Sequence, residues 1–240
     1  KETGSTFVYV THDQQEAMTL ATKICLINNG VLQQYEAPLD VYKQPNNLFV
    51  ADFIGSPSIN FIEVDAKQNG EEIELNMFDG VKATFKPNTY VDLDAFQKNR
   101  DKEMEAEKER KTKEAAMKGH VEKENVDRDF NYRIPKVNGV IMREEEHEEA
   151  ANKLILGVRP EFIRLSDKEG LETEIYSALP TGMETTARLR IGEFLLTAVI
   201  FGGVDYMIGA KTKINFEGNE ILLFDRKSGK LISSGQLKID

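Results

Sequence analysis

Short strand-like segments separated by glycines recur along this chain, and they restrict its possible folds more than any other feature. In the second half they cover residues 174–176, 185–191, 194–201, 213–216 and 221–224, with glycines in the turns. Short strands at regular spacing with glycine turns are typical of all-β barrels. The pattern therefore predicts a small barrel of the OB type.

The same pattern begins earlier, over residues 61–64, 73–75 and 81–85, and resumes at 154–158 after an interruption. Gly70 and Asp79-Gly80 separate the first three segments, which favours antiparallel pairing. Because helical patterns occur elsewhere in the chain, we expect an α+β protein with a mainly antiparallel, OB-like barrel.

The first 55 residues follow a different pattern, in which helices and strands alternate. Residues 6–10 are all β-branched or aromatic and predict a buried strand. Asp13 then precedes a helical segment, 14–22, in the place of an N-cap residue. The chain thus opens on a strand and without an initiating methionine, so we expect it to be a truncated piece of a longer protein.

A hairpin and two short helices are predicted next. The segments 24–27 and 31–35 flank Asn29-Gly30, the dipeptide that type I′ turns favour. Pro38 suits the first turn of one helix, and another is expected over residues 47–54.

Gly55-Ser56-Pro57 ends this region and is predicted to be a domain boundary. Residues 1–55 would form one unit and residues 56–240 a second unit. A charged insert at about 92–153 would interrupt the second unit.

The insert is mostly charged. Between Lys98 and Lys118, 14 of 21 residues carry a charge, eight basic and six acidic. Glutamate–lysine pairs four residues apart, such as Glu109 and Lys113, predict an exposed helix. A second acidic helical run is expected over residues 144–152.

The chain has 41 acidic and 31 basic residues, which gives a formal net charge of −10. A field of this sign repels polyanions, so no nucleic-acid partner is expected. The single cysteine, Cys25, excludes an internal disulfide and indicates a reducing, cytoplasmic compartment. It lies in an apolar run and is expected to be inert core. The longest apolar run, Phe194–Phe201, is far too short to span a membrane.

Of the three histidines, only His12 has a suggestive position. It follows a predicted buried strand and precedes a helix, where open α/β folds place ligand-facing groups. An imidazole there can bond a phosphate oxygen or an attacking water, or it can be purely structural. His120 and His147 lie in charged stretches and are interpreted as solvated bystanders. The motifs GxSxG, HExxH and GxxxxGK[ST] are absent.

The segment around His12 consists of Val8-Tyr9-Val10 followed by Thr11-His12-Asp13-Gln14-x-Glu16-Ala17. It resembles the switch segment, or H-loop, of ATP-binding-cassette (ABC) ATPases. The resemblance extends to the carbohydrate-importer branch, the maltose and multiple-sugar type, through Pro38-Leu39-x-Val41-Tyr42, Pro45 and Phe49-Val50-Ala51-x-Phe53-Ile54-Gly55-Ser56-Pro57-x-x-Asn60-Phe61.

The later half resembles the C-terminal regulatory domain of that branch, an OB-like module called TOBE. The matching residues are Leu156-Gly157-Val158-Arg159-Pro160-Glu161, Gly182-x-Glu184-Thr185, and Leu223-Phe224-Asp225 with Gly229. The resemblance marks Arg159, Pro160, Glu161, Gly182, Glu184 and Thr185 as candidate regulatory residues. Alternatively, Arg159 and Glu161 pair with each other in a turn, and Gly182 belongs to an ordinary loop. Ser233-Ser234-Gly235-Gln236 echoes the ABC signature, but it lacks a following helix and is interpreted as a tail.

The resemblance implies that residues 1–55 are the C-terminal remnant of an α/β nucleotide-binding domain. His12 would contact the ATP γ-phosphate and the attacking water in the full-length protein, which uses ATP and Mg²⁺. In the family the P-loop, Q-loop, signature loop and catalytic glutamate all precede the H-loop. Phosphoryl transfer needs these groups together, so this chain alone is expected to hold no complete cofactor or metal site and to be inactive.

The resemblance also implies partners for a subunit that powers sugar import. They are a second copy of the subunit, transmembrane permease subunits, and a cytoplasmic regulator such as a phosphotransferase component, all meeting at the cytoplasmic face of the cell membrane. The rival interpretation is a free-standing OB-type binding module with no ATPase role. For the charged insert, two interpretations stay open: a solvated helical excursion or a docking arm for a partner.

Overall fold

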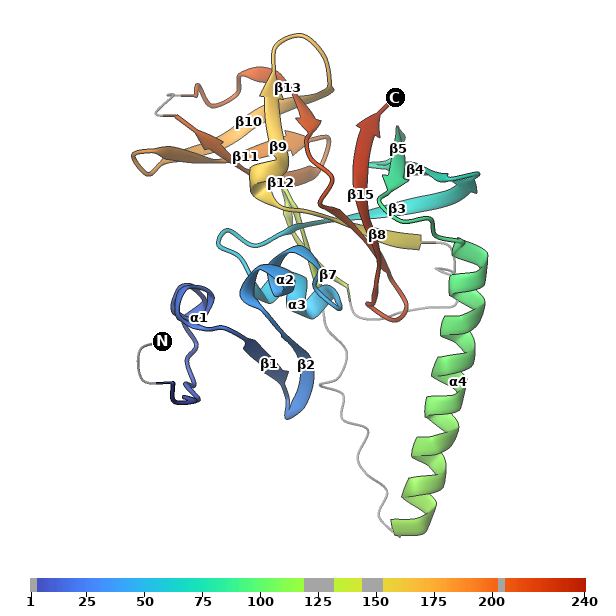
Figure 1. The fold of residues 1–240 in the computed structure, drawn as a ribbon. Coiled ribbons are helices and arrows are strands. Elements are labelled where there is room, and N and C mark those ends of the chain that lie inside the picture. Colours follow the sequence, from blue (N-terminus) through green and yellow to red (C-terminus); the bar gives the residue numbers. More distant parts are fainter. Residues whose placement is uncertain (1–3, 119–131, 144–152, 203–205) are drawn as a thin grey trace.

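The protein is described by a computed structural model that places residues 4–118, 132–143, 153–202 and 206–240. A barrel and a larger sheet lie side by side, short helices and a hairpin lie below them, and one long helix projects away (Figure 1). The barrel and the larger sheet share one hydrophobic cluster, to which Leu156 and Leu189 both belong.

The barrel is closed by six strands in the order β14-β15-β5-β4-β3-β8. Every neighbouring pair is antiparallel. Alternate residues point inward, as in β4, where Ile73, Leu75 and Met77 are buried and their neighbours are exposed. The predicted OB-like barrel is confirmed. The strands are β3 (Asn60–Asn69), β4 (Glu72–Met77), β5 (Val81–Pro87), β8 (Lys153–Val158), β14 (Ile221–Asp225) and β15 (Leu231–Ile239).

The second sheet has seven strands in the order β7-β6-β12-β11-β10-β13-β9. Its long strands coincide with the segments at 174–176, 185–191 and 194–201, which were predicted to belong to the barrel and instead form this separate sheet. The strands are β6 (Tyr132–Lys136), β7 (Gly139–Arg143), β9 (Ile163–Ser166), β10 (Leu171–Pro180), β11 (Glu184–Ile191), β12 (Phe194–Phe201) and β13 (Lys211–Phe216). A short 3₁₀ turn, η3 (Pro160–Phe162), joins β8 of the barrel to β9 of this sheet.

The N-terminal part confirms the predicted hairpin and helices. They are α1 (Gln14–Leu20), β1 (Ile24–Asn28), β2 (Val31–Glu36), α2 (Pro38–Lys43) and α3 (Leu48–Phe53). Asn29 and Gly30 both have positive φ, 48° and 77°, which is the backbone of a type I′ turn. Asp13 caps α1, and Asn47 caps α3 by accepting a bond from the Val50 N–H.

Two predictions for this part were wrong. Residues 6–10 do not form a strand, and Phe7, Val8 and Val10 are 80, 91 and 90% exposed. A strand needs a neighbour to satisfy its backbone, and no described strand pairs with this segment. Cys25 is exposed rather than core, because strand alternation turns Ile24 and Leu26 inward and Cys25 outward.

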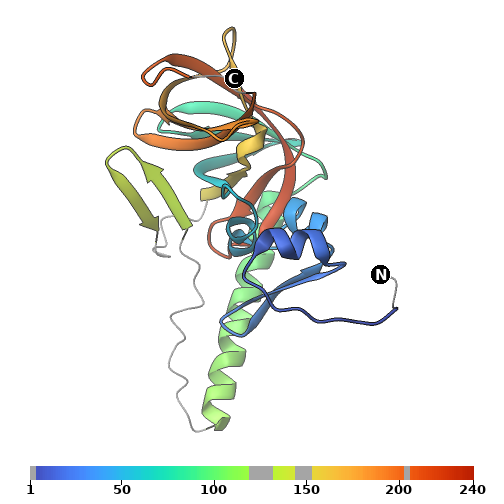
Figure 2. The same cartoon turned by 90° about the vertical axis from the view of Figure 1, so that its left-hand side faces the viewer.

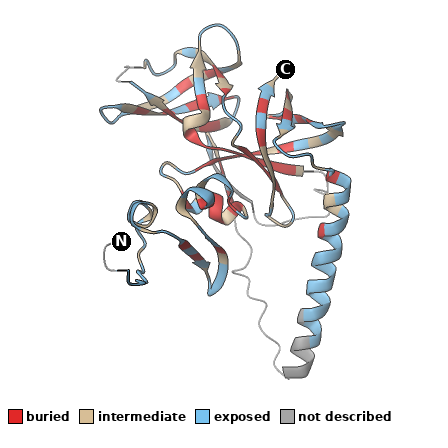
Figure 3. Ribbon diagram, in the orientation of Figure 1, coloured by how far each residue is buried: buried red, intermediate tan, exposed pale blue. Residues whose placement is uncertain are grey.

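The predicted charged helix is present as α4 (Leu93–Lys118), which projects from the barrel with most of its described surface in solvent (Figures 2 and 3). The predicted pair Glu109–Lys113 forms at 3.5 Å. The acidic run 144–152 and the histidines His120 and His147 lie outside the described residues.

The predicted insert contains more than a charged excursion, because the hairpin β6–β7 lies within it. Tyr132 and Ile134 of β6 are each only 5% exposed and pack with Phe61 of the barrel and Leu48 of α3. The edge of Phe61 meets the Tyr132 ring at a centroid distance of 5.9 Å. Apolar side chains at alternate positions of a short strand anchor this part of the insert.

The interpretation of Ser233-Ser234-Gly235-Gln236 as a tail was also wrong. These residues lie within β15, which pairs with β14 on one side and β5 on the other. Gly235 is buried where the strands approach closely, and a Cβ there would lie 2.3 Å from the Lys86 carbonyl oxygen.

Candidate functional site

His12 lies on a short connection that its neighbours hold in place, and its own side chain is exposed. Asp13 Oδ1 accepts bonds from the N–H groups of Gln15 and Glu16, at 2.8 and 3.1 Å. Thr11 Oγ1 accepts from the Asp13 N–H at 2.9 Å and donates to Glu16 at 3.1 Å. The backbone on both sides of His12 is therefore fixed while the imidazole faces solvent, an arrangement that suits contact with an external phosphate or water.

Helix α1, which begins two residues after His12, is tied to the end of α3. The side chain of Gln14 accepts a hydrogen bond from the Gly55 N–H at 2.9 Å. Ala17 and Met18 pack against the small cluster formed by Ile24, Leu26 and neighbouring apolar residues.

Arg159, one of the predicted regulatory residues, is 2% exposed and lies between the barrel and the N-terminal helices. Its guanidinium donates to the carbonyl oxygens of Ile54, Tyr42 and Ala51 at 2.5, 2.7 and 3.4 Å. Those oxygens lie in the last turns of α2 and α3, where helices leave carbonyls unpaired and carry partial negative charge. The side chain of Arg159, which directly follows β8, therefore caps two helices of the N-terminal part.

The Arg159 guanidinium also stacks on the Tyr42 ring, 3.8 Å from its centroid. Burial lowers the pKa of Arg159, and the nearby Tyr42 and Glu161 oppose that effect. The Tyr42 hydroxyl donates a short hydrogen bond to Glu161. Burial and then this bond raise the pKa of Tyr42 well above its usual range. We call Tyr42, Gly55, Arg159 and Glu161 the junction.

The structure brings Arg159, Pro160 and Glu161 together against residues 42–54. Pro160 is buried at the start of η3 and fixes the turn between the other two. Both charged side chains form hydrogen bonds to the N-terminal helical segment. The proposed regulatory role of these three residues remains a prediction.

The other predicted regulatory residues lie elsewhere, at the turn between β10 and β11 of the seven-stranded sheet (Figure 1). Gly182 has a φ of 99°, and the Thr181 N–H donates to the Glu184 carbonyl at 2.8 Å to close the turn. Thr185 is fully buried, and its Oγ1 has no hydrogen-bond partner among the described residues.

Large apolar side chains are exposed at this turn, near the ends of β10 and β12, and in the segment that leads into β13. We call them the tip patch: Leu179, Met183, Phe201, Met207 and Ile208, exposed by 65, 86, 65, 79 and 72%. The Gly202 N–H bonds to the Met183 carbonyl, which holds the end of β12 beside the turn. Exposed apolar patches of this kind are typical of protein interaction surfaces.

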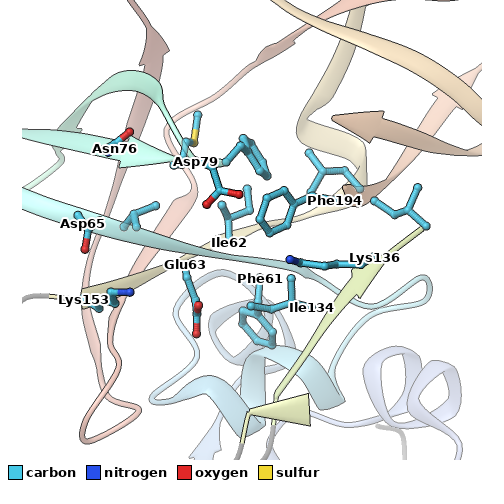
Figure 4. A pocket seen from close by; sticks show the side chains of 15 residues that line it. Phe61, Ile62, Glu63, Asp65, Asn76, Asp79, Ile134, Lys136, Lys153 and Phe194 are labelled. Atoms are coloured by element: carbon cyan, nitrogen blue, oxygen red, sulfur yellow. The ribbon is translucent and has the colours of Figure 1, made fainter. Parts of the chain in front are cut away.

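A cavity of about 440 Å³ lies between β3, the β4–β5 turn, β6 and the start of β12 (Figure 4). Two of its charged side chains, Glu63 and Lys136, are engaged by residues outside the lining. Glu63 accepts a bond from Tyr132 at 2.7 Å and lies 3.5 Å from Arg226, and Lys136 pairs with Glu193 at 3.3 Å. The cavity contains none of the predicted site residues.

Two absences apply to the described part of the chain alone. It contains no group of three or more His, Cys, Asp and Glu side chains placed to hold a metal ion. None of its helices combines the length and the apolarity that a membrane crossing requires.

Neither Tyr42, as a member of the junction, nor Gln14, as the hydrogen-bond partner of Gly55, was predicted from the sequence. Tyr42 and Glu161 are 119 positions apart in the chain, and Gln14 and Gly55 are 41 apart. No local pattern encodes contacts over such separations.

Known proteins give a consistent comparison, although no family model matches the chain. The chain is 53% identical over 70 residues to the osmoprotective compounds uptake ATP-binding protein GgtA of Synechocystis, which covers 29% of this chain and 19% of the relative. It is 47% identical over 94 residues to the spermidine/putrescine import ATP-binding protein PotA of Acetivibrio thermocellus, covering 39% and 26%.

An alignment with the xylose/arabinose import ATP-binding protein XacK of Haloferax volcanii covers nearly the whole chain. It spans 98% of this chain and 48% of the relative at 28% identity over 244 residues. The homologues of this chain are ATP-binding subunits of ABC transporters. The chain spans less than half the length of these relatives.

The comparisons agree with the ABC resemblance of the His12 segment at the level of the ATP-binding subunit. The alignment with XacK runs through the barrel as well as the N-terminal part. It therefore favours an ABC ATP-binding subunit over a free-standing OB-type module.

Proposed function

We propose that this chain is the C-terminal part of the ATP-binding subunit of an ABC importer for carbohydrates. Residues 1–55 would complete a nucleotide-binding domain, and residues 56–240 would form its OB-like regulatory domain of the TOBE type. The observation that carries the proposal is the alignment of nearly the whole chain with a xylose/arabinose import ATP-binding protein.

The exposure of the N-terminal part supports this proposal. Phe7, Val8, Tyr9 and Val10 lie in solvent although their sequence is that of a buried strand. Leu20, Ile27, Leu32 and Leu39 are also 58–71% exposed. Burial of a large aliphatic or aromatic side chain yields roughly 1.5–3 kcal/mol, so these residues favour a covering element. In the proposed protein, the preceding part of the nucleotide-binding domain covers them.

His12 would act within that longer protein. Its imidazole would donate to a γ-phosphate oxygen or orient the attacking water, while Asp13 and Thr11 hold the backbone. ATP and Mg²⁺ would bind mainly to loops that precede residue 1, and this chain alone would not turn over ATP.

The proposed partners are a second copy of the subunit, the permease subunits and a cytoplasmic regulator. The tip patch supports a protein contact on the regulatory domain, because its five large side chains are at least 65% exposed. Attachment to the cytoplasmic face of the membrane would come through the permease subunits.

The test uses the longer protein assembled with its permease subunits in vesicles. We expect ATP-dependent uptake of a pentose such as xylose, and His12→Ala should reduce both ATP hydrolysis and uptake by about 100-fold or more, as for loss of a catalytic group. Gln15→Ala, on the exposed surface of α1, is the matched control and should have no effect. ATP turnover by the chain of 240 residues alone would contradict the proposal.

A polyamine importer is the second candidate, favoured by the 47% identity to PotA over 94 residues. Parallel uptake assays with spermidine and xylose separate the two. Uptake of spermidine without xylose would overturn the carbohydrate assignment and leave the ABC assignment intact.

A further inference from the structure

A single peptide group, between Ile54 and Gly55, is hydrogen-bonded on both sides. Its N–H donates to Gln14 Oε1 at 2.9 Å, and its C=O accepts from Arg159 Nη1 at 2.5 Å. Gln14 begins α1, two residues after His12, and Arg159 directly follows barrel strand β8. This peptide group therefore connects the His12 segment to the barrel.

The two hydrogen bonds reinforce each other. A charged donor on a carbonyl polarises the amide, which makes its N–H a stronger donor to the next acceptor. Arg159 is only 2% exposed, so solvent screens its charge little. Weakening the bond to Arg159 should therefore weaken the bond to Gln14 as well.

Both ends of the connection are held by further contacts. At the barrel end, Arg159 also bonds the Tyr42 carbonyl, and Glu161 accepts from the Tyr42 hydroxyl. At the other end, Asp13 bonds the first N–H groups of α1, so a shift of Gln14 also moves the backbone beside His12. A displacement at the Arg159 end is therefore transmitted to the Gln14 end, and the reverse.

We propose that Gln14 and Arg159 are positioning residues that couple the barrel to His12 through the Ile54–Gly55 peptide group. A partner that displaces Glu161 or Tyr42 would thereby change the placement of His12. The role of His12 in this proposal rests on the proposed function, whereas the coupling itself is a property of this chain and is measured without nucleotide.

The first test is amide hydrogen exchange at Gly55 by NMR in the chain described here. Gln14→Leu removes the acceptor, and exchange should become about 2- to 13-fold faster, the range for a net hydrogen-bond contribution of roughly 0.5–1.5 kcal/mol. Gln14→Glu keeps an acceptor oxygen and should restore protection. The control Gln15→Leu, one residue further on, should leave the Gly55 rate unchanged.

The second test asks whether Arg159 acts on α1. Arg159→Lys should shift the amide signals of residues 12–17 and speed exchange at Gly55. The control Arg226→Lys alters another arginine of low exposure, which bonds Tyr132 of β6 and pairs with Glu63 of β3, and should leave those signals in place. Tyr42→Phe, which keeps the ring over Arg159 and removes only its hydroxyl, serves if Arg159→Lys does not fold.

Coupling predicts that Gln14→Leu and Arg159→Lys together speed Gly55 exchange by less than the product of their separate effects. Multiplicative effects, or unchanged signals at residues 12–17 in Arg159→Lys and Tyr42→Phe, would overturn the proposal.

In the longer protein, Gln14→Leu should lower kcat for ATP hydrolysis and leave KM for ATP unchanged, because positioning affects the chemical step more than nucleotide binding. Absence of ATP hydrolysis by the unaltered longer protein would refute the proposed function, and the exchange results would still decide the coupling. An unchanged kcat in Gln14→Leu would refute the positioning role.

Discussion

Gly55 occupies a position that a larger residue could not fill without displacing Arg159. Its φ is 124°, a conformation open mainly to glycine, and a Cβ there would lie 2.8 Å from Arg159 Nη1. The restriction at this residue follows from its neighbour more than 100 positions later in the sequence, as the hydrogen bond between Arg159 and Ile54 shows.

Gly55→Ala should therefore lower the free energy of unfolding by about 1–3 kcal/mol from backbone strain, with an added contribution from displaced Arg159. Urea unfolding gives the value. Gly80→Ala is the matched control, because Gly80 has a similarly restricted φ, 141°, but has open space around it. An equal loss in the two variants would mean that the contact with Arg159 contributes nothing.

Two tyrosines, the half-buried Tyr42 and the buried Tyr132, make stability depend on alkaline pH. Burial, followed by a hydrogen bond to a carboxylate, raises the pKa of Tyr42 and of Tyr132 well above the usual value. The folded state thus retains the phenol proton at a pH where the unfolded state loses it, near pH 10. Their contribution is complete below about pH 10 and is lost as the pH rises further.

We expect Tyr42→Phe and Tyr132→Phe each to flatten the fall in unfolding free energy above about pH 10. Urea titrations at several alkaline pH values test this. Tyr90→Phe, at a 64% exposed side chain, should leave the slope unchanged. A slope that is the same in all three variants would show that the hydroxyls of Tyr42 and Tyr132 do not cause the fall in unfolding free energy.

At the scale of secondary-structure elements, local sequence patterns predicted those elements whose cause is local. The Asn29-Gly30 hairpin, the Asp13 cap and the alternation in β4 all depend on nearby residues. The strand predicted at residues 6–10 does not form, because a strand also requires a partner. The prediction of a tail at Ser233-Ser234-Gly235-Gln236 failed because its partner strands, β5 and β14, are encoded elsewhere in the sequence. Tyr132 was not predicted to anchor the insert, because nothing near it in the sequence signals its contact with Phe61.

Helix α4 illustrates the difference between buried and exposed ion pairs. Arg100 and Asp225, with side chains 5 and 1% exposed, pair at 2.6 Å and fix the base of α4 to the barrel. Asp225 also accepts bonds from the N–H and hydroxyl of Ser228. Further along α4, the pair Glu109–Lys113 is largely in solvent.

Arg100→Ala should cost about 3–5 kcal/mol of unfolding free energy, because Asp225 would remain buried without its counter-charge. Lys113→Ala should cost less than about 1 kcal/mol. Alanine has high helix propensity at both positions, so chemical denaturation compares the ion pairs directly. Similar losses in the two variants would indicate that α4 is not anchored by Arg100.

At the scale of the whole molecule, the described residues expose apolar side chains on the N-terminal part and at the tip patch. The motifs around His12 predicted ABC ATP-binding subunits as homologues, and the composition gave no sign of either exposed region. Exposure depends on the folded arrangement, which sequence alone did not supply for the junction or the tip patch. The regulatory roles of Arg159, Glu161 and Gly182 remain predictions.

If the tip patch carries the contact between copies, Met183→Asp with Phe201→Asp should weaken self-association, because charge replaces buried apolar surface. Sedimentation over a range of concentrations measures the change. Leu39→Asp, on the exposed N-terminal face, is the control. Weakened association in Leu39→Asp alone would assign the contact to the N-terminal part.

The closed barrel also has a consequence for synthesis. Strand β8 pairs with both β3 and β14, and β15 pairs with β5, so the barrel combines strands from before and after the long interruption. The interruption itself changes the equilibrium little, because loop entropy rises only with the logarithm of length. The delay between the synthesis of paired strands matters more. Strands β3 to β5 leave the ribosome early, and the edge of β5 stays unpaired until Leu231–Ile239 emerges, so the unfinished chain exposes a strand edge that can pair with other chains.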